Sequence, residues 1–322
     1  MDPAMDTRTP LPEVPEIARV PGMEDCTAEI DGIRWRYLRA GSGPVLLVIH
    51  GFMSYSFSWR FVLQELAQHY SVYAVDLPNC GFSERSSRYP GTLESDVEHV
   101  LSFLDHHGIE RCDVLGTSRG GGLAIALAGL LAERGIPGRL RRLVLSAPIN
   151  PWMRYGMARV RFARTRLGRF YLVRLARKFP FIMREFFRKL YVDGSRIPAD
   201  SFEGYRAGLE PAGSFEHLWN VARSWMDDLK RIESVLPLVE PVPALLLWGD
   251  RDRVVAVSSA EELHARWKNS VVAMMERMGH MPYEEAPREF NRIVLDFLLR
   301  GTPSTPLEKE ERGLATAENS RA

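Results

Sequence analysis

Ser118, in the stretch "GTSRGG" (116–121), is the side chain best placed to act as a nucleophile. It lies in a G-x-S-x-G pattern between a short apolar run, 112–116, and a long helical pattern, 121–135. A strained strand-to-helix turn lifts a serine hydroxyl clear of a sheet, and small neighbours make room for the turn. The N-terminus of the following helix favours a developing negative charge. This context predicts a nucleophilic serine rather than an idle serine in a glycine-rich turn.

A serine hydroxyl is a poor nucleophile at neutral pH without a base, and His280 in "MGHMPYEEAP" is the candidate base. A histidine base needs a carboxylate that orients its ring. The stretch "LLLWGDRDRVV" offers two, Asp250 and Asp252, after a predicted strand. His50 follows a central strand and is interpreted as structural. The remaining histidines lie on predicted helices or at their ends: His69, His99, His106, His107, His217 and His264.

Apolar, β-rich runs alternate with helical patterns along the chain. The runs are 44–51, 70–78, 112–116, 141–148, 243–250 and 270–276, and the helical patterns are 58–68, 93–108, 121–135 and 287–301. The alternation predicts βαβ units and an α/β fold whose mainly parallel sheet is covered on both faces. In such sheets, sites lie beyond the carboxyl ends of the strands. The candidate residues all follow predicted strands, so this edge is where we expect the site.

Five motifs together resemble those of the α/β-hydrolase fold enzymes, over about residues 30–300. "HGF" (50–52) resembles the oxyanion loop, "DLPNCGFSE" (76–84) a D-x-x-G-x-G-x-S loop, and "GTSRGG" the nucleophile elbow. "WGDRDRVV" resembles the acid loop and "GHMPYEEAP" the histidine loop. The resemblance implies an eight-stranded type of sheet with helices on both faces and an inserted helical cap. The chain order Ser, Asp, His is the one this architecture uses.

The resemblance also divides the roles of the two carboxylates. The family's G-x-x-D pattern falls on Gly249 and Asp252, so Asp252 is implied as the catalytic acid beside Ser118 and His280. Asp250 is then a structural carboxylate. Some relatives place the acid after the preceding strand, but here that neighbourhood reads "SAPINPW" and holds no carboxylate.

The resemblance also implies that the backbone N–H groups of Phe52 and Arg119 form the oxyanion hole. Such a reaction needs no metal or cofactor. Asn79 replaces the first glycine of the D-x-x-G-x-G-x-S loop, and asparagine accepts left-handed backbone angles better than most residues. Arg119 stands where many relatives carry an uncharged residue. Its guanidinium is either ion-paired beside the elbow or contacts a substrate carboxylate. Cys80 is interpreted as a packed thiol, not a second nucleophile.

The predicted organisation has four parts. A proline-rich, extended N-terminal arm covers 1–22, and a flexible tail with few large apolar residues covers 301–322. The α/β-hydrolase core is formed by 23–149 and 238–300. Residues 150–237 interrupt the alternation of strands and helices, and by resemblance they form a helical cap over the site.

Residues 158–192 of the insert contain eleven Arg and Lys and one Glu, a net charge of +10, so the rest of the chain carries +1 − 10 = −9. Apolar and aromatic residues are interleaved at helical spacing, which is typical of a surface-seeking segment. Three interpretations stay open. The segment is a solvated cap whose aromatic residues pack on the core and line the pocket, a face that contacts anionic membranes, or a site for an anionic substrate.

The composition limits the class of protein. The 322 residues include 42 basic and 41 acidic ones, so the net charge of +1 gives the whole chain no bias towards nucleic acid or membranes. The cysteines Cys26, Cys80 and Cys112 have no CxxC spacing, which argues against a disulfide framework or a structural metal. The acidic, proline-rich N-terminal stretch lacks the pattern expected of a secretory signal, and no apolar run approaches the roughly 18–20 residues of a membrane span. We therefore expect a cytoplasmic protein.

The sequence predicts a serine hydrolase that cleaves carboxylic esters through an acyl-enzyme, with an apolar substrate part under the cap. A carbon–carbon bond hydrolase acting on vinylogous diketones is one alternative, although such relatives often carry Trp where Met281 follows the histidine here. A ligand receptor on the same scaffold, with little turnover, is the other. A serine at the elbow argues against haloalkane dehalogenases and epoxide hydrolases, which use aspartate there.

Overall fold

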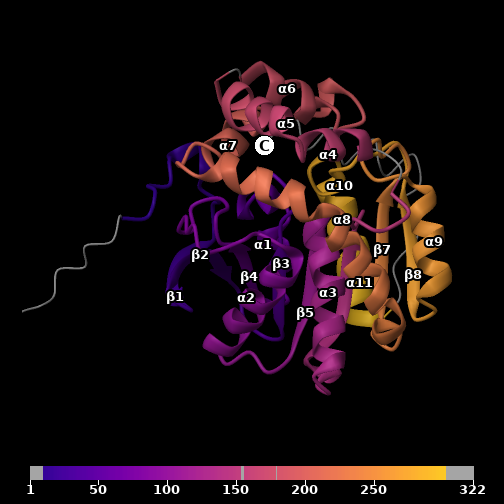
Figure 1. Cartoon of the computed structure of the whole chain (residues 1–322). Coiled ribbons are helices and arrows are strands. Elements are labelled where there is room, and N and C mark those ends of the chain that lie inside the picture. The colour runs from indigo at the N-terminus through magenta and orange to yellow at the C-terminus, as the bar shows by residue number, and fades with distance from the viewer. Residues whose placement is uncertain (1–9, 154–155, 179, 302–322) are drawn as a thin grey trace, which may run out of the picture.

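An eight-stranded sheet forms the centre of the computed structural model, which describes residues 10–153, 156–178 and 180–301 (Figure 1). The strands are β1 (Glu24–Ile30), β2 (Ile33–Ala40), β3 (Val45–Ile49), β4 (Ser71–Asp76), β5 (Cys112–Thr117), β6 (Leu140–Ser146), β7 (Ala244–Gly249) and β8 (Ser270–Met275). Their order is β1-β2-β4-β3-β5-β6-β7-β8. The β1–β2 and β2–β4 pairs are antiparallel, and the remaining neighbours are parallel. The predicted α/β class with a mainly parallel sheet is confirmed.

The central strands are buried on both faces, which explains their continuous apolar runs. In β3, Leu46 and Val48 join the core on one face of the sheet, while Leu47 and Ile49 join the core on the other. Successive side chains of a strand point to opposite faces, so each core receives every second residue. All six runs predicted from the sequence form strands of this sheet.

Helices cover both faces of the sheet. One core contains residues of α2 (Leu93–His106), α3 (Arg119–Glu133), α9 (Ser258–Arg266) and the C-terminal half of α8 (Ser214–Val239). The other contains residues of η2 (Ser56–Trp59), α1 (Leu63–Leu66), α10 (Pro282–Glu285) and α11 (Pro287–Arg300). The short 3₁₀ turns η1 (Glu16–Ala18) and η3 (Pro137–Arg139) complete the elements outside the insert.

Two parts of the fold differ from the sequence patterns. The helix predicted over 58–68 is reduced to the short η2 and α1. Trp59 and Val62, at the end of η2 and just before α1, are fully buried, so tertiary packing outweighs helix propensity here. The strands β1 and β2 form a hairpin that the apolar runs did not indicate. Its turn residues Asp31 and Gly32 have φ values of 53° and 72°, as a two-residue hairpin turn requires.

Between β6 and β7 the chain forms a layer of helices over the carboxyl edge of the sheet, at the top of Figure 1. We call this layer the cap. It comprises α4 (Met157–Ala163), α5 (Arg166–Phe170), the π-helical η4 (Tyr171–Ala176), α6 (Pro180–Arg188), the 3₁₀ turn η5 (Gly194–Arg196), α7 (Ser201–Ala207) and the N-terminal half of α8. Among the described residues, every helix lacks the length and apolar character that a membrane span requires. Of the predicted arm and tail, 1–9 and 302–322 lie outside the described residues.

Candidate active site

Ser118 lies at the sharp turn between β5 and α3, with φ of 50° and ψ of −117°. Few residues other than glycine adopt such angles. The Ser118 N–H donates to the Ser146 carbonyl oxygen (2.9 Å) at the end of β6. A Cβ atom on Gly116 would lie 2.5 Å from the Gly120 oxygen, and one on Gly120 would lie 2.4 Å from the His50 oxygen. The two glycines of G-x-S-x-G are therefore a packing requirement of this turn.

His280 and Asp252 meet between the loops that follow β8 and β7. Asp252 Oδ2 accepts a hydrogen bond from His280 Nδ1 (2.7 Å), and both side chains are buried. Asp252 Oδ1 accepts hydrogen bonds from the N–H groups of Val254 (2.7 Å) and Val255 (3.0 Å). Because an ionised carboxylate only accepts, this bond places the ring proton on Nδ1 and leaves Nε2 as the basic nitrogen.

Asp250 supports the loop rather than the histidine ring. Its exposed carboxylate accepts a hydrogen bond from the Met278 N–H (3.2 Å). The Arg251 N–H in turn donates to the Met278 carbonyl (3.0 Å). These bonds close the loop just before His280. Of the two candidate carboxylates, the structure brings Asp252 to His280 and gives Asp250 a structural position.

The backbone at Phe52 is oriented by His50. The Leu77 N–H donates to His50 Nε2 (3.2 Å), so the ring proton is on Nδ1, which donates to the Gly51 carbonyl (2.8 Å). The C=O and the next N–H of a trans peptide point in opposite directions, so the Phe52 N–H is directed away from the His50 ring. Phe52 and Ser118 line the same cavity. Burial lowers the pKa of His50, which keeps the ring neutral.

The Arg119 side chain is buried in an ion-pair network. Its guanidinium bonds to the Asp96 carboxylate on α2, donates to the Gly91 carbonyl (3.0 Å), and lies 3.8 Å from Asp228 Oδ2 on α8. Of the two interpretations of this side chain, the structure therefore shows the ion pair beside the elbow. As the first residue of α3, Arg119 also has a backbone N–H without a partner inside the helix. This is the group that the predicted oxyanion hole requires.

Ser118 and His280 both line a cavity of about 1290 Å³ between the sheet edge and the cap. The Trp225 ring on α8 packs edge-on against the Phe52 ring, with centroids 5.5 Å apart. Ligand cavities typically measure about 300–1,000 Å³, so this one has room for a large group. Apolar and aromatic side chains dominate its walls, among them Phe52, Met153, Phe186, Phe187, Phe215 and Trp225.

Glu285 ties the cap to the loop that carries His280. Its Oε1 accepts a hydrogen bond from the Gly279 N–H (2.6 Å), and its Oε2 accepts one from the Val192 N–H (3.0 Å). In parallel, the His280 N–H donates to the Leu190 carbonyl (2.7 Å). The backbone N–H of the predicted base is therefore held directly by Leu190 of the cap segment, and the N–H of the preceding residue is held by Glu285, which also binds Val192.

Glu284 forms a second, fully buried connection. Its two carboxylate oxygens accept hydrogen bonds from Arg60 Nη1 and Nη2 (2.9 Å each). The hydroxyl of Tyr191 also donates to it (2.7 Å), as does that of Tyr205. No role was predicted for either glutamate. The available signal was two adjacent acids in an otherwise apolar stretch between two prolines.

A pH-dependent effect on stability is expected from Glu285. Burial raises its pKa from 4.5 to about 7. Between these values the unfolded chain loses the proton while the folded protein keeps it, so stability falls as the pH rises through this range. Glu285→Gln removes the titration. The difference in the free energy of unfolding between wild type and Glu285→Gln, measured with urea, should therefore be smaller at about pH 8 than at about pH 5. A constant or increasing difference would contradict the assignment.

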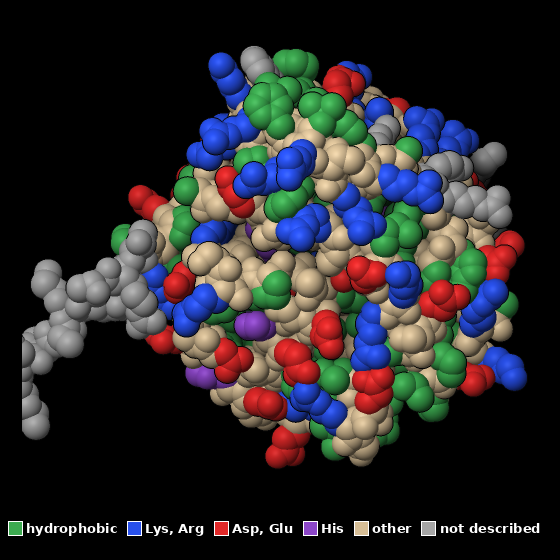
Figure 2. Space-filling model, in the orientation of Figure 1, with side chains coloured by type: hydrophobic (Ala, Val, Ile, Leu, Met, Phe, Trp, Pro, Cys, Tyr) green, Lys and Arg blue, Asp and Glu red, His purple; other side chains and the backbone are tan. Residues whose placement is uncertain are grey.

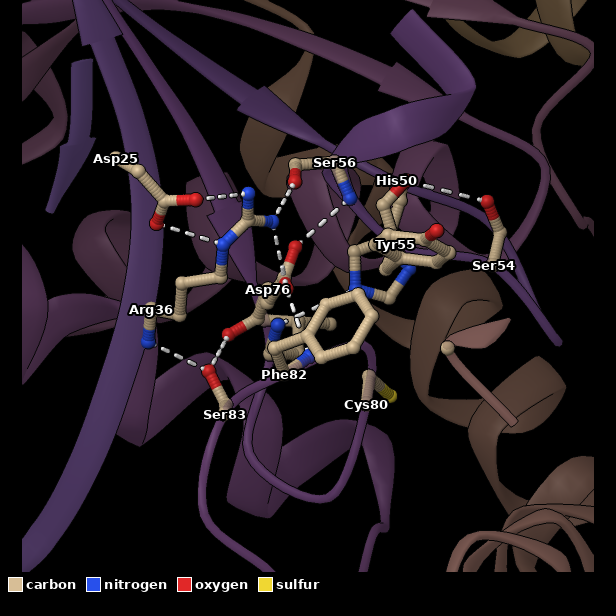
Figure 3. A network of polar contacts seen from close by, with 12 residues as sticks. Asp25, Arg36, His50, Ser54, Tyr55, Ser56, Asp76, Cys80, Phe82 and Ser83 are labelled. Carbon is tan, nitrogen blue, oxygen red and sulfur yellow. Dashed lines mark hydrogen bonds and ion pairs between the residues drawn. The ribbon is translucent and has the colours of Figure 1, made fainter. Parts of the chain in front are cut away.

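Asp76 binds the backbone of Ser56, four positions after Phe52, and Figure 3 shows its contacts. Its carboxylate accepts hydrogen bonds from the N–H groups of Ser56 and Phe82, both at 2.9 Å. Arg36 on β2 donates to Asp76 (3.2 Å) and forms a bidentate pair with Asp25 (2.8 and 2.7 Å). The first residue of the D-x-x-G-x-G-x-S loop is therefore a structural anchor next to the site.

The same loop contains the two unusual residues noted in the sequence. Asn79 adopts a φ of 64°, the left-handed region that asparagine tolerates. Cys80 Sγ lies 3.4 Å from His217 Nε2. Burial raises the pKa of Cys80 to about 12 and lowers that of His217 to about 3, so no thiolate forms near neutral pH. Within the described ranges, no group of three or more His, Cys, Asp or Glu residues could hold a metal ion.

Comparisons with known proteins find similar hydrolases. A family model described as alpha/beta hydrolase fold matches residues 44–287. The uncharacterized hydrolase YugF of Bacillus subtilis is 27% identical over 273 residues, 84% of this chain and 96% of that protein. The 2-hydroxymuconate semialdehyde hydrolase of Pseudomonas sp. strain CF600 is 29% identical over 281 residues, 83% and 91% of the two chains. A solved structure of a membrane phospholipase A, a bacterial virulence factor, has a TM-score of 0.69 at 27% identity, covering 88% of this chain and 87% of that one.

Proposed function

Because the chain belongs to the α/β-hydrolase fold family, we propose that it is a serine hydrolase that cleaves carboxylic esters with a large apolar part. One observation supports this most directly. A serine on a strained elbow shares an apolar cavity with a histidine that is hydrogen-bonded to a buried carboxylate. That combination supplies a nucleophile, a base and an orienting acid for acyl transfer.

In the first half of the proposed reaction, Ser118 Oγ attacks the ester carbonyl carbon while His280 Nε2 takes the hydroxyl proton. Asp252 stabilises the resulting imidazolium through the Nδ1 bond. The backbone N–H groups of Phe52 and Arg119 hold the oxyanion, and each such donor typically contributes about 3 kcal/mol to transition-state stabilisation. His280 then gives its proton to the leaving alcohol, and an acyl-enzyme remains.

In the second half, a water molecule attacks the acyl carbonyl and His280 Nε2 takes its proton. The tetrahedral intermediate collapses, the proton returns to Ser118 Oγ, and the carboxylic acid leaves. All proton transfers use groups of the chain itself, and the N–H groups of Phe52 and Arg119 again hold the oxyanion.

The cavity supports an apolar substrate part. Aromatic and aliphatic side chains form most of the wall beside Ser118, and the volume of about 1290 Å³ accommodates a long acyl chain. The similarity to a protein described as a membrane phospholipase A agrees with a lipophilic ester. Each buried methylene group contributes up to about 0.8 kcal/mol of binding, about fourfold in an equilibrium or rate ratio.

A series of nitrophenyl esters from acetyl to dodecanoyl tests this proposal. The expected result is that kcat/KM rises with acyl length, by up to about fourfold for each methylene, until the chain fills the cavity. A maximum at acetyl followed by a steady decline would contradict the long-chain assignment. Binding of the same esters without turnover would favour the ligand receptor instead.

Carbon–carbon bond hydrolysis is the second candidate, because the 2-hydroxymuconate semialdehyde hydrolase is among the similar proteins. The same serine and histidine would serve it. Met281, which lines the cavity after the predicted base, stands where such relatives often carry Trp. Turnover of a vinylogous diketone with a higher kcat/KM than that of any ester in the series would favour this alternative.

A further inference from the structure

The outer side of the cap exposes a cluster of large apolar side chains. In the described ranges, five of the eleven exposed large hydrophobic residues fall within 162–181, each with 40–67% of its surface exposed, and the other six are scattered over the rest of the chain. Scattered exposed apolar residues are normal, whereas a cluster rimmed by polar groups marks an interaction surface. The five residues are Phe162, Leu167, Phe170, Tyr171 and Phe181. We call them the outer cap patch.

The patch follows the helix geometry. Leu167, Phe170 and Tyr171 are spaced i, i+3 and i+4 along α5 and the start of η4, so they lie on one face. The Phe162 ring contacts the Tyr171 ring edge-on, with centroids 6.1 Å apart. Val173, two residues beyond Tyr171, is buried on the inner side. The helix therefore presents apolar residues both to the protein and to solvent.

Basic residues surround the patch. In Figure 2, Lys and Arg side chains mix with hydrophobic ones over the cap, while acidic side chains are more numerous on the lower part of this face. Glu185 is the one acidic residue in 158–192. Some cations have local partners: Arg184 pairs with Glu203 (3.3 Å) and Arg188 with Glu185 (3.4 Å). The exposed cations of this segment are Arg161, Arg164, Arg166, Arg169, Arg174, Arg177, Lys178, Arg184, Arg188 and Lys189.

The cavity reaches the surface within this patch. Phe162, Tyr171 and Phe181 belong to the patch and also line the cavity that contains Ser118. Side chains that face both solvent and the cavity mark its opening. A molecule that leaves an apolar phase at the patch would therefore meet a cavity with mainly apolar walls that contains Ser118.

We propose that the outer cap patch docks on the surface of an anionic phospholipid bilayer, from which a lipophilic ester passes into the cavity. A bilayer matches both the apolar and the basic residues of this surface. Apolar side chains enter the boundary between headgroups and acyl chains, while cations contact the anionic headgroups. A polyanion such as RNA would pair with the cations but leave Leu167 and Phe181 in water. The proposal of docking depends only on the outer cap patch, whereas the delivery of a substrate also rests on the proposed ester hydrolysis.

Vesicle flotation tests the docking with two variants of the full chain. Arg166→Glu/Arg174→Glu reverses two charges, and Leu167→Ser/Phe170→Ser removes two apolar side chains; none of the four lines the cavity. The vesicles are phosphatidylcholine alone or with phosphatidylglycerol. Wild type should float with the anionic vesicles at low salt and not with the neutral ones. Each lost cation should weaken partitioning roughly fivefold, so the charge variant should lose at least about 25-fold, and the apolar variant at least about tenfold.

The matched control is Arg111→Glu/Lys268→Glu, which reverses two exposed charges just before β5 and β8, at the opposite edge of the sheet. This control should float like wild type. Failure of wild type to float with anionic vesicles would overturn the proposal, as would an equal loss in the control. Flotation that is insensitive to Leu167→Ser/Phe170→Ser would overturn the proposal, because it would show attraction by charge alone, as a polyanion would give.

Hydrolysis of a soluble short-chain ester separates the two proposals. Both patch variants should retain wild-type rates on it, which also shows that they fold. Flotation that persists in a protein with no esterase activity would refute the proposed function and leave the docking surface standing.

Discussion

Replacing Ser118 with alanine is expected to lower kcat/KM for ester hydrolysis by roughly 10⁴-fold or more. The substitution removes the attacking oxygen and leaves the Asp252–His280 pair and the cavity in place. Alanine bears the same backbone strain at φ of 50°, so stability should change little. Steady-state hydrolysis of a nitrophenyl ester and thermal unfolding measure the two effects.

Ser146→Ala is the matched control. Ser146 lies at the end of the neighbouring strand β6, is fully buried, and its hydroxyl has no hydrogen-bond partner among the described residues. Its loss should change kcat/KM by no more than about threefold. A fluorophosphonate probe should label wild type and Ser146→Ala but not Ser118→Ala. Equal hydrolysis by wild type and Ser118→Ala would refute the nucleophile.

Asp252→Asn should lower kcat by roughly 10⁴-fold, because it imposes the wrong histidine tautomer. Oδ1 accepts two backbone N–H groups, from Val254 and Val255. The asparagine must therefore put its carbonyl oxygen there and turn its NH₂ group towards His280 Nδ1. Nδ1 then has to accept, the ring proton moves to Nε2, and Nε2 no longer takes a proton from Ser118.

The neighbouring carboxylate provides the comparison for this variant. Asp250 accepts one hydrogen bond, from the Met278 N–H, and an asparagine carbonyl can accept it equally well. Asp250→Asn should therefore keep kcat within about threefold of wild type. Similar losses in the two variants would show that both carboxylates act through the loop rather than through the ring of His280.

The residues that meet at the candidate site could be named from the sequence because their motifs are local. The turn at Ser118 needs glycines two positions away on either side, so five consecutive residues are enough to identify it. Asp252 and His280 each follow an apolar run that ends at the same sheet edge. Strand ends of a parallel sheet meet in space however far apart they lie in the chain.

The partners that hold the site could not be predicted, because they depend on contacts between distant segments. Arg60 and Glu284 are 224 positions apart, and Arg119 meets Asp228 only because α8 crosses α3. The β1–β2 hairpin was missed for another reason. The Asp31–Gly32 pair is a recognisable hairpin turn, but β1 is largely exposed and so has no apolar run that would indicate a strand.

Two parts of the cap differ in how they contact the loop that carries His280. Residues 190–205 share hydrogen bonds with the segment 279–285, whereas among the described residues 157–189 supply no such bond to it. A chimaera in which 157–189 is replaced by the corresponding segment of a relative should therefore keep its turnover. Exchanging 190–205 as well would dislodge the imidazole. The part of the cavity wall formed by 157–189 and the support of His280 by 190–205 thus lie in adjoining stretches, which we expect to be exchangeable separately.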